Sequence, residues 1–176
     1  MASNKQLLSF YYGEGPDTRC RFLREILNWP DDELERTHDF IQWLFPLDEP
    51  SGFNLDAPIL DVDTIRKFRL SPPLHRNLQT SLLRMLRFYG FEMRHTVPLR
   101  VVCAPDFAER AANWITPNNH NHLRITRILK SLRLLGLKTN ASAFYDCLLE
   151  ICRQEFEKAS PCISHETCKY WQPAAS

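Results

Sequence analysis

The sequence predicts an all-α fold: a single compact domain of about seven helices with one long proline-containing loop. Glycine is scarce, with 5 residues in 176, whereas the 12 prolines fall mostly between segments of helical periodicity. Apolar residues in those segments recur at three- and four-residue steps, the spacing of one helical face. A length of 176 residues suits one core, so we expect a single domain over residues 1–176.

The first two helices are predicted at residues 17–29 and 31–45. Four apolar residues share one face of the first helix: Cys20, Leu23, Ile26 and Leu27. Pro30 closes that helix, and three acidic residues after it supply a cap and a negative first turn for the second. Residues 46–60 contain three prolines and no helical period, so we expect a long loop of the kind that often carries function.

The remaining helices follow from caps and apolar periodicity. They are predicted at residues 61–70, 72–89, 105–114, 117–135 and 139–158, with a short helical tail at 166–171. Gly90 and Gly136 end two of them. Residues 91–104 form either a short extended pair or a segment that wraps the surface.

The six cysteines are expected to be reduced. Disulfide frameworks belong to small secreted domains, and the chain lacks the features of one. Four cysteines lie near the end of the chain: Cys147, Cys152, Cys162 and Cys168. With His165 they could be drawn as a zinc site, but the spacing lacks paired C-x2-C knuckles. No metal or cofactor is therefore expected.

Charge is distributed unevenly along a chain of net charge +1. Residues 1–60 carry 5 Lys/Arg against 11 Asp/Glu, and residues 61–138 carry 14 against 5. The basic residues are spread out and lack interleaved aromatics, which argues against a nucleic-acid surface. No signal peptide or transmembrane segment is recognisable, so we expect a soluble protein of the cytoplasm or the nucleus.

Two segments resemble signatures of the opioid growth factor receptor domain family. They are HDFIQWLFP at residues 38–46, with PSGFN at 50–54, and NHNHLRITRILKSL at 119–132. LRFYG at residues 86–90 and TCKYW at 167–171 also fit, and the resemblance spans residues 10–172. The animal members of the family, which are associated with the nucleus, are described as receptors for an enkephalin peptide that also regulates growth. The resemblance implies a receptor-like domain that binds a peptide or small anionic ligand in a helical cleft.

The predicted ligand contacts lie on the two signature helices: His38, Gln42, Trp43, His120, Arg124 and Arg127. His38 and Gln42 are four apart and share a predicted helical face. His120, Arg124 and Arg127 form a polar stripe near a helix N-terminus, and guanidinium groups suit a carboxylate or phosphate there.

Other interpretations of these residues stay open. The stripe could be a solvated face, or either arginine could bridge to Asp39 or Glu35 of the earlier helix, and Trp43 could be core or cleft wall. A metal or haem pocket of His38, His120 and His122 lacks a histidine pair on one face.

Two further function classes remain. An enzyme would use His38 or His120 as general base with the arginines holding an anionic substrate, although no familiar catalytic motif is present. A scaffold would dock a protein partner through residues 46–60 or the acidic first third of the chain.

Overall fold

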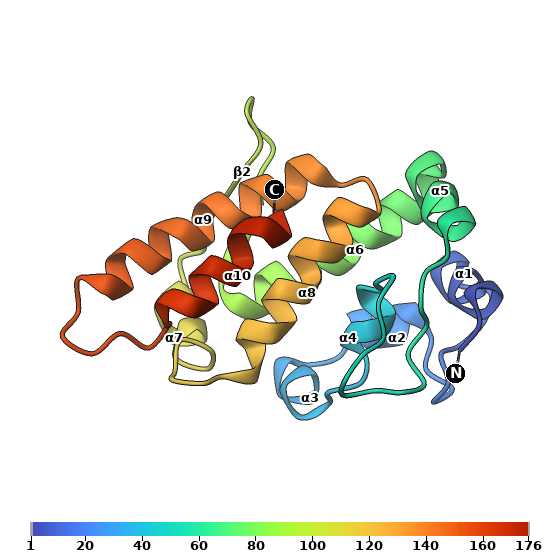
Figure 1. Ribbon diagram of the computed structural model, residues 1–176, viewed down its shortest axis with the longest axis horizontal. Coiled ribbons are helices and arrows are strands. Elements are labelled where there is room, and N and C mark those ends of the chain that lie inside the picture. The colour runs from blue at the N-terminus through green and yellow to red at the C-terminus, as the bar shows by residue number, and fades with distance from the viewer. Residues whose placement is uncertain (1, 176) are drawn as a thin grey trace. The chain divides into compact units, whose positions relative to one another are not determined.

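The computed structural model describes residues 2–175, which form ten helices and one two-stranded sheet (Figure 1). The predicted helical class is confirmed in the main, whereas the expected seven helices are too few and the sheet is an addition. No helix in this range combines the length and apolarity needed to cross a bilayer. The backbone clusters into two compact units, Met1–Leu82 with Leu134–Gly136 and Leu83–Arg133 with Leu137–Ser176, and each is described by itself. The single domain predicted for residues 1–176 stays a prediction.

The first unit contains a helix that the sequence analysis did not predict. Its helices are α1 (Asn4–Tyr12), α2 (Leu23–Leu27), α3 (Asp31–Arg36), α4 (Ile41–Leu44), α5 (Val62–Leu70) and the first part of α6 (Pro72–Tyr89). α1 begins because the Ser3 hydroxyl accepts the Gln6 N–H at 3.1 Å, and it ends at Gly13, whose φ is 76°. Ser and Gln at this spacing are a helix-start signal that the sequence does contain.

The helix predicted at residues 17–29 is wrong for its first half. The Asp17 carboxylate accepts the N–H groups of Arg19 at 2.8 Å and Arg21 at 3.0 Å. Such local side-chain acceptors offer the main chain an alternative to helical bonding. Cys20 is exposed with a φ of 61°, so it does not join the apolar face, and the helix begins only at Leu23.

The helix predicted at residues 31–45 is also wrong, because it is broken into α3 and α4. Thr37 is extended and ends α3, and the chain becomes helical again only at Ile41. Inside the break, the Asp39 carboxylate receives Arg21 Nη1 at 2.9 Å and also pairs with Arg19. His38 lies in this break and not on a helix, so His38 and Gln42 do not share a helical face.

The second half of this unit follows the sequence more closely. Residues 46–60 form the predicted loop, with the Leu60 N–H bonded to the Leu47 carbonyl at 2.9 Å. The Asp61 carboxylate caps α5 by accepting the Thr64 N–H at 2.7 Å. α6 begins at Pro72 as predicted.

The second unit contains the rest of α6, a hairpin and four further helices. These elements are β1 (Phe91–Arg94), β2 (Arg100–Cys103), α7 (Phe107–Ala111), α8 (His120–Leu134), α9 (Lys138–Phe156) and α10 (His165–Ala175). β1 and β2 pair antiparallel with Phe91 opposite Cys103, which confirms the extended pair among the two alternatives for residues 91–104. Gly90 ends α6 at a φ of 84°, where a Cβ would come within 3.0 Å of the Phe107 Cα.

An aromatic cluster forms the core of this unit. The Phe91 ring lies 5.3 Å from the Phe107 ring and 5.8 Å from those of Trp114 and Phe144. The Trp114 indole N–H donates to the Tyr89 carbonyl at 3.0 Å, which satisfies the polar atom of a fully buried side chain. The hairpin, α7 and α9 are thereby packed into one core.

α9 and α10 lie side by side and run in opposite directions (Figure 1), and a disulfide joins Cys152 of α9 to Cys168 of α10. The expectation of reduced thiols is wrong for this pair, because the antiparallel helices bring the two Cα atoms to 6.6 Å. The other four cysteines are free. Within residues 2–175, no three His, Cys, Asp or Glu side chains lie together in a way that could hold a metal ion.

Candidate functional site

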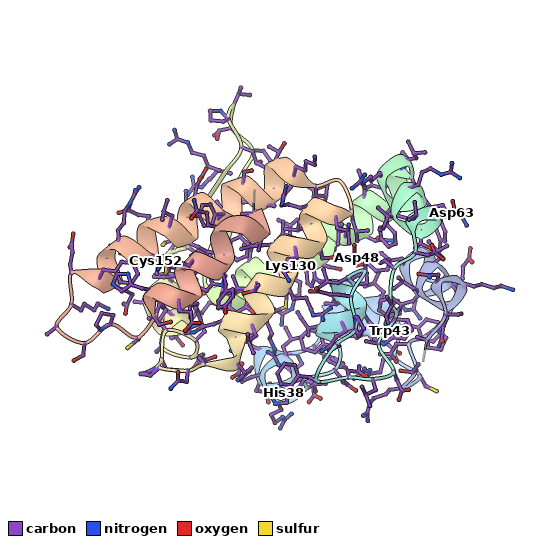
Figure 2. All side chains as sticks on the ribbon, viewed as in Figure 1. His38, Trp43, Asp48, Asp63, Lys130 and Cys152 are labelled. Carbon is purple, nitrogen blue, oxygen red and sulfur yellow. A yellow bond between two sulfur atoms is a disulfide. The ribbon has the colours of Figure 1, made fainter. Side chains whose placement is uncertain are left out.

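The six predicted ligand contacts fall in different units. His38, Gln42 and Trp43 belong to the first unit, where Figure 2 labels His38 and Trp43. His120, Arg124 and Arg127 belong to the second unit. Each group is therefore considered within its own unit.

Within the first unit, the predicted contacts have unlike surroundings. His38 is exposed, whereas Trp43 is fully buried with its ring edge-on to Phe10 at 5.2 Å. Trp43 is therefore a core residue. Gln42 is buried too, with Nε2 3.5 Å from the Ser51 hydroxyl. Gln42 Oε1 and Trp43 Nε1 are buried and have no hydrogen-bond partner within residues 2–175.

On α8, the predicted arginines differ in exposure. Arg124 is 5% exposed and donates through Nη1 to Asn121 Oδ1 at 3.1 Å, while Arg127 and His120 are half-buried. His122 is a buried packing residue, because its Nε2 lies 3.0 Å from the Trp114 carbonyl and burial lowers its pKa.

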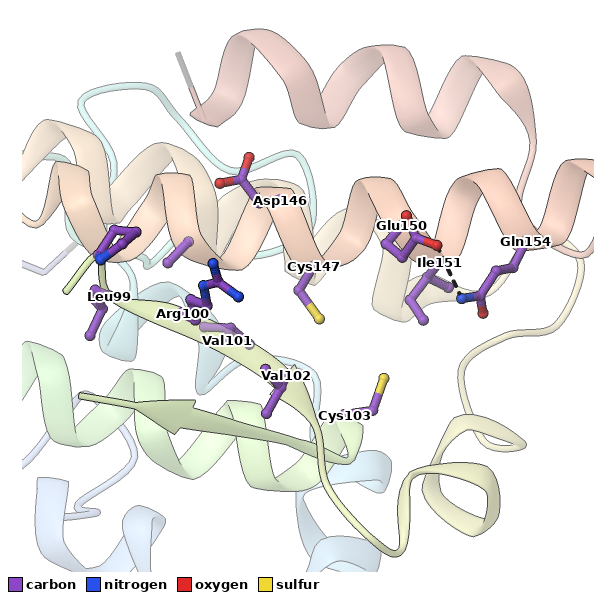
Figure 3. A pocket seen from close by; sticks show the side chains of 12 residues that line it. Leu99, Arg100, Val101, Val102, Cys103, Asp146, Cys147, Glu150, Ile151 and Gln154 are labelled. Carbon is purple, nitrogen blue, oxygen red and sulfur yellow. Dashed lines mark hydrogen bonds between the residues drawn. The ribbon is translucent and has the colours of Figure 1, made fainter. Parts of the chain in front are cut away.

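A groove of about 520 Å³ lies beside the hairpin of the second unit (Figure 3). One wall is the segment 98–103, which includes β2. The other wall is one side of α9: Ala143, Asp146, Cys147, Glu150, Ile151 and Gln154. None of the predicted contacts lines it. The sequence signals that could have indicated this groove are a strand-like run, VPLRVVC at residues 97–103, and polar residues at four-residue steps on α9, namely Asp146, Glu150 and Gln154.

Two thiols meet inside this groove. Cys103 of β2 and Cys147 of α9 both line it, and Figure 3 shows both sulfur atoms between the strand and the helix. Burial raises the pKa of both thiols, that of Cys147 to about 12. At neutral pH both thiols are therefore protonated. They line the groove as small apolar groups and are poor nucleophiles.

The charged groups of the groove are exposed. Glu150 accepts Arg153 Nη1 at 3.4 Å and Gln154 Nε2 at 3.3 Å. The side chains of Asp146 and Arg100 have no hydrogen-bond or ion-pair partner within residues 2–175. The groove therefore has two carboxylates and one guanidinium, which give it a net negative charge. A concave surface with a few charged groups suits the binding of a ligand.

A smaller hollow of about 370 Å³ lies in the first unit between α1 and α5. Its lining includes Arg66 and Lys67. It is smaller than the groove beside β2, and its lining includes none of the predicted contacts.

Comparison with known proteins gives the family. The sequence profile described as "Opioid growth factor receptor (OGFr) conserved region" matches residues 3–174. The chain is 42% identical to the mouse opioid growth factor receptor over 74% of its length, and 42% identical to the human one over 66%. It is 32% identical to the mouse opioid growth factor receptor-like protein 1 over 85% of its length.

The matched segments make up 21%, 17% and 32% of those three proteins, so the chain spans about a third or less of its relatives. No solved structure matches the chain. The family profile covers nearly the whole sequence, as the two signature segments led us to expect. The chain therefore belongs to the opioid growth factor receptor family.

Proposed function

We propose that this chain is a ligand-binding domain that takes a peptide, with the groove between β2 and α9 as its site. The groove itself carries the proposal, because it sets a mostly apolar strand wall against a helix side that bears Asp146, Glu150 and Gln154, in a volume of about 520 Å³. Concave, mostly apolar surfaces with a few polar groups are typical of ligand sites. The name of the relatives, opioid growth factor receptor, supports a peptide as the ligand.

The charge of the groove favours a peptide over the small anion that was the sequence-based alternative. Asp146 and Glu150 would repel an anion, and Arg100 alone would have to hold it. The basic side chains of His120, Arg124 and Arg127 on α8 would bind an anion better than the groove would. Arg124 is buried there, which counts against direct ligand contact. Ligand contacts by the six residues chosen from the sequence remain a prediction.

The test is a titration of fluorescein-labelled enkephalin with the protein, followed by fluorescence anisotropy. Gln154→Trp places a large ring at one end of the groove, and Ser142→Trp places the same ring on an exposed position of α9 outside it. We expect Gln154→Trp to weaken binding by about tenfold, the effect of losing a few good contacts, and Ser142→Trp to leave it unchanged. Thermal melting of both variants checks that the fold is intact.

Two results would contradict the proposal. Equal binding by both folded variants would place the peptide elsewhere on the protein. An absence of any anisotropy change with the native protein, for enkephalin and for every other peptide tried, would mean that the chain is not a peptide-binding domain.

A further inference from the structure

One edge of β2 has no partner strand. The Ala104 N–H bonds to the Gly90 carbonyl at 2.9 Å, and Phe91 lies opposite Cys103. In an antiparallel pair, hydrogen-bonded residues alternate with residues whose main-chain groups point outward. Val101 and Cys103 therefore turn their N–H and C=O groups away from β1. Within residues 2–175, no group bonds to the main chain of either residue.

The groove runs along this open edge. The side chains of Val101 and Cys103 face α9, because the residues opposite them do. Phe91, opposite Cys103, lies 5.8 Å from the Phe144 ring of α9, and the sulfur of Met93, opposite Val101, is 3.6 Å from Asn140 Nδ2. Figure 3 shows α9 passing beside the strand, with the Cys147 side chain pointing toward β2. The space next to the open edge is thus bounded by the same side of α9 that carries the acidic residues.

Those acidic residues are spaced like alternate residues of a strand. Asp146 and Glu150 are four apart on α9 and so lie about 6 Å apart along the helix axis. Side chains on one face of a strand repeat about every 6.8 Å. The ion pair of Glu150 with Arg153 joins two exposed side chains, and such pairs contribute little, so Glu150 can exchange it for another cation.

We propose that the groove binds its peptide as an added antiparallel strand on β2, with two basic side chains, two residues apart, meeting Asp146 and Glu150. The proposal rests on the proposed function and adds how the peptide is held and which peptides fit. Main-chain bonds to Val101 and Cys103 supply the pairing, and the alternate side chains supply selectivity. In an antiparallel register, the peptide residues that bond to β2 are the two basic ones.

A second copy of this chain would fit the same edge less well. Pairing two β2 strands edge to edge would bring Val101 and Cys103 of one copy toward the carboxylates of the other. Neither side chain carries a positive charge. Charge complementarity therefore favours a basic peptide over self-association through β2.

The probe is a fluorescein-labelled, end-capped five-residue peptide with lysines at its second and fourth positions and threonines elsewhere. Methylating both lysine amide nitrogens removes the donors that would face β2, whereas methylating the amides of the third and fifth residues removes donors that would point away. We expect the first modification to weaken binding by about tenfold or more, because two main-chain bonds are lost, and the second to have little effect. A peptide with glutamates in place of the lysines should not bind.

Charge reversal in the protein tests the selectivity. The double variant Asp146→Lys, Glu150→Lys should lose the lysine peptide and bind the glutamate peptide, while Glu157→Lys, at the exposed end of α9, should behave like the native protein. Melting temperatures check the fold of each variant.

The outcomes separate this proposal from the broader one. Equal binding of the two methylated peptides, or enkephalin binding without lysine-peptide binding, would overturn strand addition and leave the peptide-binding function standing. Failure of every peptide would overturn both. A dimer in sedimentation that the double variant abolishes would show that a second copy occupies the groove and would also overturn the proposal.

Discussion

The indole N–H of Trp171 donates to the main-chain carbonyl of His122 at 3.2 Å, and the two rings meet edge to face at 6.0 Å. On its other side, His122 packs against Trp114 at 6.5 Å. α10 is therefore fixed to the first turn of α8 by a buried tryptophan as well as to α9 by a disulfide. Two residues of the TCKYW segment, Cys168 and Trp171, therefore have a packing role.

Trp171→Phe should lower the free energy of unfolding by about 1–2 kcal/mol, since it removes one buried hydrogen bond and some packed volume. The His122 carbonyl keeps a partner in the Thr126 hydroxyl, at 3.0 Å, which limits the loss. Urea unfolding measures the change. Tyr170→Phe, at the exposed neighbouring position, is the control, and an equal loss in both variants would contradict the packing role.

Stability should fall as the pH drops through the range just below 6.5. Burial lowers the pKa of His122 in the folded state, so the unfolded chain takes up its proton first. The neutral histidine thus contributes stability that is present above the unfolded pKa and is lost on acidification. Melting temperatures between pH 7.5 and 5 should decrease less steeply for His122→Gln than for His95→Gln, which changes an exposed residue of the hairpin turn. Parallel curves for the two variants would contradict this assignment.

The disulfide between Cys152 and Cys168 closes a loop over a sequence separation of 16 residues. A cross-link that closes a loop of this length stabilises the folded protein by about 3 kcal/mol, mainly because it restricts the unfolded chain. Cys152→Ser with Cys168→Ser should therefore melt well below the native protein, and reduction of the native protein should lower its melting temperature similarly. Cys20→Ser changes a free, exposed thiol and should have little effect. A native protein that titrates six free thiols before reduction would show the bridge to be absent.

Local signals in the sequence predicted the later helices well. The proline start at Pro72 and the stop at Gly90 act within a few residues, so they can be recognised without the fold. The family signatures likewise gave the family. These features share one property, which is that their physical cause lies next to them in the chain.

The features that the sequence analysis missed depend on contacts between residues that are far apart in the sequence. The break between α3 and α4 involves Asp39, which pairs with Arg21 from 18 residues earlier. The groove needs β2 and α9 to meet, although Cys103 and Cys147 are 44 positions apart in the sequence. Periodicity alone shows neither relationship, because it reports which face of an element is apolar and not what that face will contact.

Arg21→Ala should destabilise the protein by about 3 kcal/mol, the scale expected when one partner of a largely buried ion pair is removed. Arg21 donates to Asp17 at 2.7 Å and to Asp39 at 2.9 Å, and the Asp17 carboxylate is buried. Burial disfavours the charge of Arg21, but the hydrogen bonds and attraction of both carboxylates outweigh this and raise its pKa. Arg24→Ala, at an exposed position of α2, should change stability little. Equal effects in urea unfolding would rule out the network as a source of stability.

Arg124 and Arg127 were both predicted to contact the ligand. Because Arg124 is buried and Arg127 is half-buried, their variants can distinguish a stabilising role from ligand contact. Arg124 is 5% exposed and bonded to Asn121, so Arg124→Ala should lower the free energy of unfolding by about 2–3 kcal/mol, because it leaves buried polar groups unpaired. Arg127 is half-buried, and Arg127→Ala should cost less. If the ligand lies in the groove beside β2, both variants should keep their enkephalin affinity at temperatures where they are folded. Loss of affinity in Arg127→Ala at an unchanged melting temperature would instead return the ligand site to α8, where the sequence first placed it.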